Sequence, residues 1–177
     1  MLPEPAPADQ GDDLFQTLVR AFASYGQLDY VRFEPLSRYM TRMYMRAGEV
    51  LWQQFDPPDG LYVIESGVLR AKYTLAERGA AVEESMVGGT IAGELSALAD
   101  LPRNATVSVE QDAILWKLST ENWRKLEQED PELARTFLHL VLKGMHYLDV
   151  RRLHADHFAT VAKSDFDILL SALAVRQ

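Results

Sequence analysis

The sequence contains no cysteine among its 177 residues. Disulfides, thiolate catalysis and thiolate metal sites are therefore excluded. No run approaches eighteen uncharged apolar residues, so we expect no segment of this chain to insert into a membrane. The formal net charge is −8, and an acidic chain lacks the basic face through which proteins bind nucleic acid. We therefore expect a cytoplasmic protein that does not bind nucleic acid.

Three catalytic signatures are also absent: a Gly-x-Ser-x-Gly elbow, a phosphate loop ending in Gly-Lys, and His-Glu-x-x-His. The four histidines all lie late in the chain, at His139, His146, His154 and His157. A metalloenzyme built on a barrel of strands would need imidazoles on those strands. Two histidines three residues apart on a helix are a weak metal signal. We predict that the protein is not an enzyme and has no metal or cofactor.

The composition, with 47% hydrophobic and 25% charged residues, is typical of one globular domain with a sizeable core. Patterning divides the chain into four segments. We expect a disordered leader over residues 1–10 and a helical segment over 11–44. A β jelly roll follows over 45–119, and C-terminal helices occupy 120–177. The predicted fold class is thus α+β, dominated by the jelly roll.

Short apolar runs separated by turn residues predict the strands of the jelly roll. Alternation is clearest where Leu69 and Ala71 oppose Arg70 and Lys72. Ser66-Gly67 is interpreted as a turn between two strands. The expected strands are 50–53, 61–64, 68–75, 82–87, 106–109 and 114–118. Many short strands at this spacing indicate a sandwich or jelly roll.

Helices are predicted at both ends from apolar spacing and capping residues. Asp130-Pro131 is the strongest start, because it combines an N-cap with a proline in the first turn. The expected helices are 12–24, a short one from Pro35, one capped by Ser119 or Thr120 and ending near Glu129, one from Asp130 to about His157, and one from Ser164.

Residues 91–107 contain a turn into a short helix that is suited to binding an anion. Small side chains at Ala92, Gly93, Ser96 and Ala97 allow a ligand to approach the main chain. The free N–H groups of a first helical turn carry partial positive charge. One phosphate group is therefore a suitable ligand for this turn.

Arg103 follows ten positions after Gly93 and would complete the site, because a guanidinium supplies parallel donors and a permanent charge. Glu94 would repel phosphate, and a carboxylate there is better explained by hydrogen bonds from a ligand hydroxyl, as with ribose. Phosphate and a sugar hydroxyl together indicate a nucleotide. Two alternatives remain open: a structural ion pair between Arg103 and Glu94, and an ordinary tight turn at Gly93.

This segment resembles the phosphate-binding cassette of the cyclic nucleotide-binding domain family, which runs Phe-Gly-Glu-Leu-Ala-Leu, a spacer, then Pro-Arg-Ala-Ala-Thr-Val. Gly93-Glu94-Leu95 and Pro102-Arg103 stand at the family spacing, and the likeness covers roughly residues 36–150. The resemblance implies a non-catalytic regulatory domain that binds a cyclic nucleotide, cyclic AMP favoured over cyclic GMP, and couples binding to movement of the C-terminal helix. It places the cassette at 92–105, with Glu94 on the ribose and Arg103, Gly93, Ser96, Ala97 and Asn104 on the phosphate.

The chain departs from the family pattern at three positions. Ala92 stands where the family has Phe, Phe55 where it usually has Gly before Asp56, and Asn104 where it usually has Ala. A Phe-to-Ala hole left empty would cost about 3–5 kcal/mol, so we expect Phe55 or another ring to fill it.

These departures also motivate an alternative function, in which the fold is kept and the ligand lost. The segment Gly-Thr-Ile-Ala-Gly-Glu-Leu most resembles the cytosolic module of fungal sulfate-permease-type transporters. In that alternative the domain is an interaction module tethered to a transmembrane transporter.

Overall fold

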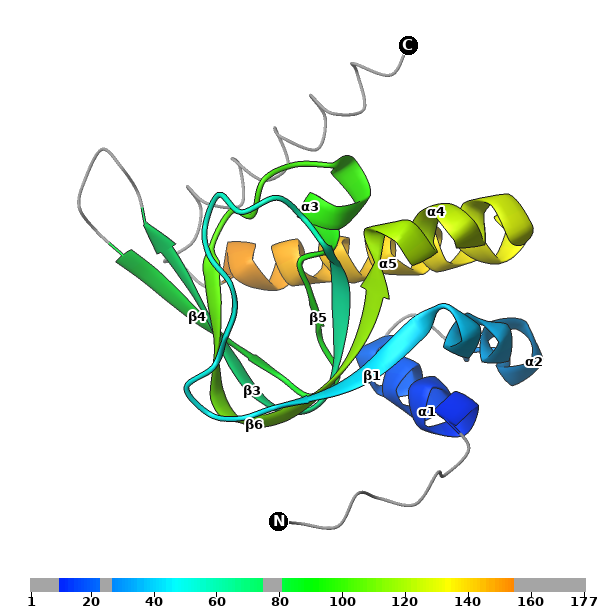
Figure 1. The fold of residues 1–177 in the computed structure, drawn as a ribbon, viewed down its shortest axis with the longest axis horizontal. Coiled ribbons are helices and arrows are strands. Elements are labelled where there is room, and N and C mark those ends of the chain that lie inside the picture. Colours follow the sequence, from blue (N-terminus) through cyan, green and yellow to red (C-terminus); the bar gives the residue numbers. More distant parts are fainter. Residues whose placement is uncertain (1–9, 23–26, 75–80, 155–177) are drawn as a thin grey trace.

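The computed structural model describes residues 10–22, 27–74 and 81–154. Six strands form one antiparallel sheet, and helices precede and follow it (Figure 1). The elements are α1 (Gln10–Phe22), α2 (Tyr30–Phe33), the 3-10 helix η2 (Glu34–Arg38), β1 (Met40–Met45), β2 (Val50–Trp52), β3 (Gly60–Thr74), β4 (Ala81–Val87), β5 (Ile91–Ala92), α3 (Glu94–Ala99), β6 (Thr106–Ser119), α4 (Thr120–Glu129) and α5 (Pro131–His154). The predicted α+β class is confirmed.

Strands β3 and β6 form the centre of the sheet, and the pairing order is β1-β6-β3-β4. Strand β2 also pairs with β6, and β5 also pairs with β3. The sheet curls into a jelly roll that does not close. Strand β3 places Leu69 and Ala71 in the interior and Lys72 at the surface, as the alternation predicted.

The predicted turn at Ser66-Gly67 is wrong, because β3 runs unbroken through it and joins two predicted strands into one. The register with β6 shifts on both sides of this point, which marks a bulge. Gly67 has φ +93, and a Cβ there would lie 2.4 Å from the carbonyl oxygen of Asp112. Glycine therefore serves a close approach of two strands here and does not end a strand. The predicted strands 106–109 and 114–118 are likewise one strand, β6.

The first strand begins earlier than predicted. Residues 40–44 were expected to belong to the helical segment, but Met40–Met45 forms β1 and pairs with β6. Only Met40 and Met45 are buried in this strand, so the alternation that signals a strand is weak. The short helix expected from Pro35 is a 3-10 helix that starts at Glu34.

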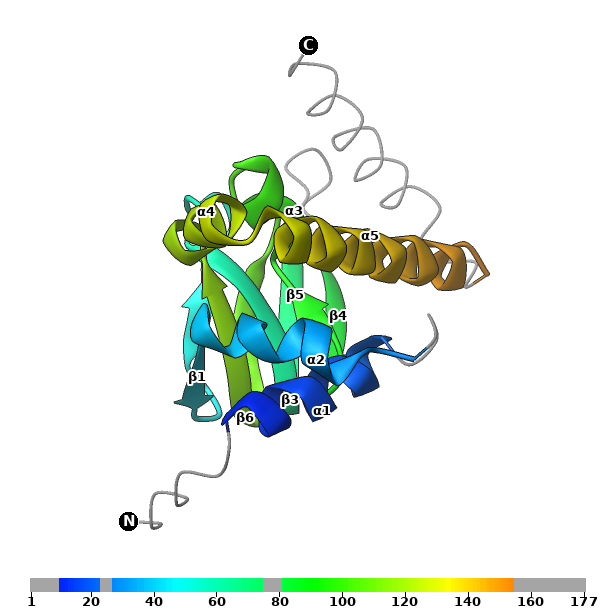
Figure 2. The ribbon, with the colours of Figure 1, turned by 90° about the vertical axis from the view of Figure 1, so that its right-hand side faces the viewer.

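Helices α1, α2 and α5 lie on one side of the sheet (Figure 2). Trp116 of β6 and Phe137 of α5 are fully buried in the core between the sheet and these helices. A Cβ on Gly144 would lie 3.2 Å from the ring of Phe22, so α1 and α5 pack closely there. A second core, which includes Leu115, lies within the curled sheet.

The predicted starts of the helices after the jelly roll are confirmed. The Ser119 hydroxyl accepts a hydrogen bond from the Asn122 amide at 3.0 Å and caps α4. The Asp130 carboxylate accepts one from the Leu133 amide at 3.0 Å, directly before Pro131 begins α5. Residues 1–9 of the predicted leader and the helix predicted from Ser164 lie outside the described residues. Gln10, the last residue assigned to that leader, is instead the first residue of α1. No helix within the described part of the chain is both long and apolar enough to cross a bilayer.

Candidate functional site

The turn that sequence analysis singled out connects β5 to the short helix α3. Gly93 caps α3 with φ +74 in the left-handed region, where glycine is favoured. A Cβ at this position would lie 2.3 Å from Nη1 of Arg103 and 3.1 Å from Cη2 of Trp52. Gly93 is therefore more than a tight turn: it leaves room for a guanidinium and an indole against the main chain.

Arg103 is buried beneath this turn, with 1% of its surface exposed. Nη1 donates a hydrogen bond to the Gly93 carbonyl at 3.0 Å, and Nη2 donates to the Gly60 carbonyl at 2.6 Å. Nη2 also donates to Oδ1 of Asp59 at 2.7 Å. The ion pair of Arg103 is thus formed with Asp59, a residue that sequence analysis did not consider.

The main chain at Arg103 is also fixed. Its amide donates to the Asp56 carbonyl at 2.8 Å, and its carbonyl accepts from the Phe55 amide at 2.7 Å. The loop between β2 and β3 therefore clamps the residue whose side chain carries the buried charge.

The ring of Trp52 packs against the guanidinium of Arg103. The guanidinium carbon of Arg103 lies 4.0 Å from the centre of the Trp52 ring, within the range of a cation–π contact. The indole N–H donates to the Ala105 carbonyl at 2.9 Å, which fixes the orientation of the ring. Trp52 also lies against Tyr62, with ring centres 5.4 Å apart. Two buried aromatic rings thus surround one side of Arg103.

Phe55 does not pack beside Ala92. Ala92 belongs to the same buried cluster as Trp52 and Tyr62. Phe55 is 75% exposed and adopts φ +74, so its side chain does not fill this space. The expectation for Phe55 is wrong, and the expectation that another ring fills the space stays a prediction, for which Trp52 of the same cluster is the candidate.

Asp59 is shared between several donors. Oδ2 accepts hydrogen bonds from the Tyr62 hydroxyl at 2.8 Å and from Nζ of Lys117 at 2.5 Å. Burial raises the pKa of Asp59, but the hydrogen bonds from Lys117, Tyr62 and Arg103 together lower this pKa below its usual value. The pKa of Tyr62 is raised by burial and by its bond to Asp59. Two cations face one carboxylate, so these three charged side chains carry a net charge of +1 (2 − 1).

One donor of Arg103 is left over. Among the described residues, Nε of Arg103 is the buried side-chain nitrogen or oxygen that has no hydrogen-bond partner. A buried N–H without an acceptor costs about 1–3 kcal/mol, and such groups call for an explanation such as a bound ion. Arg103, Lys117 and Asp59 thus combine a net positive charge with an unused donor at Nε.

The other residues predicted for the site differ in burial and in their hydrogen bonds. Ser96 is buried and its hydroxyl donates to the Pro102 carbonyl at 3.2 Å, which ties α3 to the segment before Arg103. The Ala97 amide donates to the Gly93 carbonyl at 3.1 Å within the helical turn. Glu94 is half-buried at the start of α3, whereas Asn104 is exposed.

Sequence analysis missed Trp52, Asp59 and Lys117 as parts of the site. Lys117 lies directly opposite Tyr62 in the pairing of β3 with β6, so the register of the two strands brings it to Asp59. No short motif carries that information. The one available signal was the large aromatic residue at position 52, which could compensate for the small residue Ala92.

Residues 42–130 match the cyclic nucleotide-binding domain family. The chain therefore belongs to this family, and the resemblance inferred from the cassette is confirmed. The fold is shared with the crystal structure of a cyclic nucleotide-binding domain from Methylobacillus flagellatus, with a TM-score of 0.71 and 20% identity. That match covers 86% of this chain and 85% of the other.

Two curated relatives belong to much longer proteins. A cAMP-dependent protein kinase regulatory subunit from Yarrowia lipolytica is 29% identical over 141 residues, which cover 80% of this chain and 36% of the subunit. An uncharacterized NTE family protein from Mycobacterium bovis is 26% identical over 132 residues, covering 75% of this chain and 22% of that protein. The matched region thus spans well under half the length of either relative.

Proposed function

We propose that this protein is a non-catalytic regulatory domain that binds a cyclic nucleotide at residues 92–105. In this proposal, Arg103 binds the cyclic phosphate and Glu94 accepts hydrogen bonds from the ribose hydroxyl. The small residues Gly93, Ser96 and Ala97 admit the phosphate to the main chain, and Asn104 contributes at the rim. We infer cyclic AMP over cyclic GMP, consistent with the name of the kinase regulatory subunit that the chain resembles.

The observation that carries this proposal is the buried guanidinium of Arg103, whose Nε–H has no hydrogen-bond partner among the described residues. Taking a guanidinium out of water is costly unless anions and acceptors surround it. The carboxylate of Asp59, which pairs with it, is half-exposed and also binds Lys117. An anion beside Arg103 would supply the acceptor and the negative charge that this arrangement lacks.

The output of binding in this proposal is a change in the placement of α5. This helix packs its buried residues Leu133 and Phe137 into the core beside α1. A ligand that contacts the cassette and favours one placement of α5 shifts the population toward that placement. The proposed location is cytoplasmic, and the domain itself carries out no reaction.

Calorimetry with cyclic AMP and cyclic GMP tests the proposal directly. We expect saturable binding, with cyclic AMP the tighter ligand. Arg103→Ala should weaken binding about a hundredfold, because it removes charge-assisted hydrogen bonds worth roughly 3 kcal/mol together. The matched control is Arg70→Ala, which removes an exposed arginine that pairs with Glu83 and Glu110 on the same sheet. Arg103→Lys keeps the charge and provides a second test should the alanine variant unfold. Absence of binding by the unmodified protein would overturn the proposal.

A second candidate function is an interaction module that has lost its ligand, as in the cytosolic part of a sulfate-permease-type transporter. It is supported by Asp59, Gly60 and Gly93, which accept three hydrogen bonds from Arg103 within the protein itself. The calorimetry separates the two functions, because this module should show neither heat of binding nor thermal stabilisation with either nucleotide. The transporter context is a prediction from the amino-acid sequence of the cassette.

A further inference from the structure

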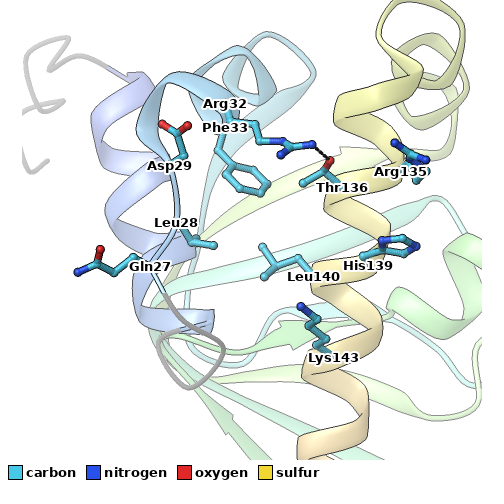
Figure 3. A pocket seen from close by; sticks show the side chains of 10 residues that line it. All are labelled: Gln27, Leu28, Asp29, Arg32, Phe33, Arg135, Thr136, His139, Leu140 and Lys143. Atoms are coloured by element: carbon cyan, nitrogen blue, oxygen red, sulfur yellow. Dashed lines mark hydrogen bonds between the residues drawn. The ribbon is translucent and has the colours of Figure 1, made fainter.

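A groove of about 510 Å³ lies between the segment around α2 and the helix α5, away from the cassette. Leu28 and Phe33 line it from the first segment, and Leu140 faces them from α5 (Figure 3). Arg32 reaches across one end, where Nη2 donates to the Thr136 hydroxyl at 2.7 Å. The groove thus has an apolar floor and one end closed by a hydrogen bond.

The rim of the groove is positively charged. Its lining includes three cations, Arg32, Arg135 and Lys143, and one anion, Asp29, which gives +2 (3 − 1) with His139 neutral. The whole chain has a net charge of −8, so this surface differs in sign from the molecule as a whole. Glu132 lies next to the groove and offsets part of the charge of Arg32 through an ion pair at 3.3 Å. Arg135 and Lys143 are the cations on α5 that extend the positive rim along this helix.

We propose that this groove binds an acidic, partly apolar peptide segment of a partner protein. Arg135, His139 and Lys143 are spaced four residues apart on one helix and are all exposed. Four residues of helix rise about 6 Å, close to the roughly 7 Å between alternate residues of an extended peptide. Alternate carboxylates of such a peptide match this row, while the apolar side chains between them point to the opposite side of the groove, where Leu28 lies.

A peptide fits this groove better than an enclosed small molecule. Ligand pockets bury about 70–90% of a small ligand, whereas the cationic residues that line this groove are exposed. Only Phe33 and Leu140 of the lining are buried. The groove therefore offers one apolar contact strip beside a charged row, which is the arrangement of a peptide-binding surface.

The probe for this proposal is a fluorescein-labelled decapeptide of alternating glutamate and leucine, with the lysine–leucine peptide as its charge control. Fluorescence anisotropy is measured on the whole chain without nucleotide, so the outcome is independent of the function proposed for the cassette. We expect saturable binding of the glutamate peptide and none of the lysine peptide. Amide shifts in an NMR titration should map to residues 27–33 and 135–143.

The double variant Arg135→Glu/Lys143→Glu should weaken binding of the glutamate peptide about tenfold, since two exposed attractions become repulsions. The matched control is Arg124→Glu/Lys125→Glu on α4, where both residues are also exposed and the change in net charge is the same. Equal losses in both double variants would show general charge attraction and overturn the proposal. The proposal would also be overturned if the peptide showed no saturable binding or if the NMR shifts mapped elsewhere. It would likewise be overturned if the groove bound laurate, a fatty-acid anion, in place of the peptide.

Discussion

Oδ1 of Asp59 lies 2.7 Å from Nη2 of Arg103, and the two residues differ sharply in exposure: 52% of the Asp59 side chain but 1% of the Arg103 side chain faces solvent. The carboxylate therefore stands at the solvent side of a buried cation. Its other oxygen is held by Lys117 and Tyr62. Removing one partner of a buried pair is more costly than its surface exposure suggests, because the other charge stays buried. Asp59 thus stabilises the buried charge of Arg103.

The stabilising effect of Asp59 should depend on pH. Its pKa in the folded protein is lowered from the usual 3.8, so its contribution is fully present above 3.8 and is lost as the pH falls through the folded value. We predict that wild type exceeds Asp59→Asn in free energy of unfolding by a constant amount above about pH 5. Below pH 3.8 this difference should narrow. Urea titrations over a pH series measure it, and a difference that stays constant to the lowest pH would contradict the prediction.

Gly93 should be intolerant of any side chain for a reason that a second glycine lacks. Gly93 and Gly48 both have positive φ, +74 and +90, so alanine at either costs about 1 kcal/mol of backbone strain. A Cβ on Gly93 would also lie 2.3 Å from Nη1 of Arg103, whereas one on Gly48 would meet nothing within 4 Å. We predict that Gly93→Ala loses clearly more stability in urea unfolding than Gly48→Ala. It should also weaken binding of cyclic AMP at least about tenfold, while Gly48→Ala leaves the affinity unchanged. Equal effects of the two variants would show that Arg103 does not need the space.

Local signals predicted the helices after the sheet better than they predicted the strands. Ser119 and Asp130 each bond an amide three residues on, and such caps can be recognised within a short stretch of sequence. Gly67 has the same appearance in the sequence whether it ends a strand or permits a bulge. Only the close approach of Asp112 from the opposing strand decides between these roles. Pairing of distant strands is information that a local pattern does not contain.

In the candidate site, too, the sequence predicted the contacts within one short segment but not those between distant strands. Gly93 and Arg103 lie within one short segment, so their spacing predicted that they would meet, and Arg103 does donate to the Gly93 carbonyl. Asp59 and Lys117 are brought together by the register of β3 with β6. Trp52 reaches the guanidinium from β2, which lies far before the cassette helix in the sequence. These partners depend on the assembled sheet, which explains why sequence analysis did not name them.

The pairing of a large residue, Trp52, with a small one, Ala92, leads to a prediction about packing. Both residues are buried in one cluster, and we expect the large ring at position 52 to compensate for the small residue at 92. Trp52→Leu should cost about 2–3 kcal/mol, since it leaves a cavity and removes the cation–π contact with Arg103. Ala92→Phe alone should cost about 1–3 kcal/mol, because the added ring meets an already filled core.

The double variant Trp52→Leu/Ala92→Phe tests whether these two positions share one space. If they do, the new ring at 92 fills the cavity left at 52, and the cost of the pair falls below the sum of the single costs by about 1 kcal/mol or more. Chemical denaturation of the four proteins measures this coupling. Binding of cyclic AMP should recover only in part. A phenylalanine at 92 restores volume, but it does not replace the indole N–H that donates to the Ala105 carbonyl or the indole ring that packs against the guanidinium of Arg103. Strictly additive costs would mean that the two side chains do not compete for volume, and the compensation inferred for Ala92 would then be wrong.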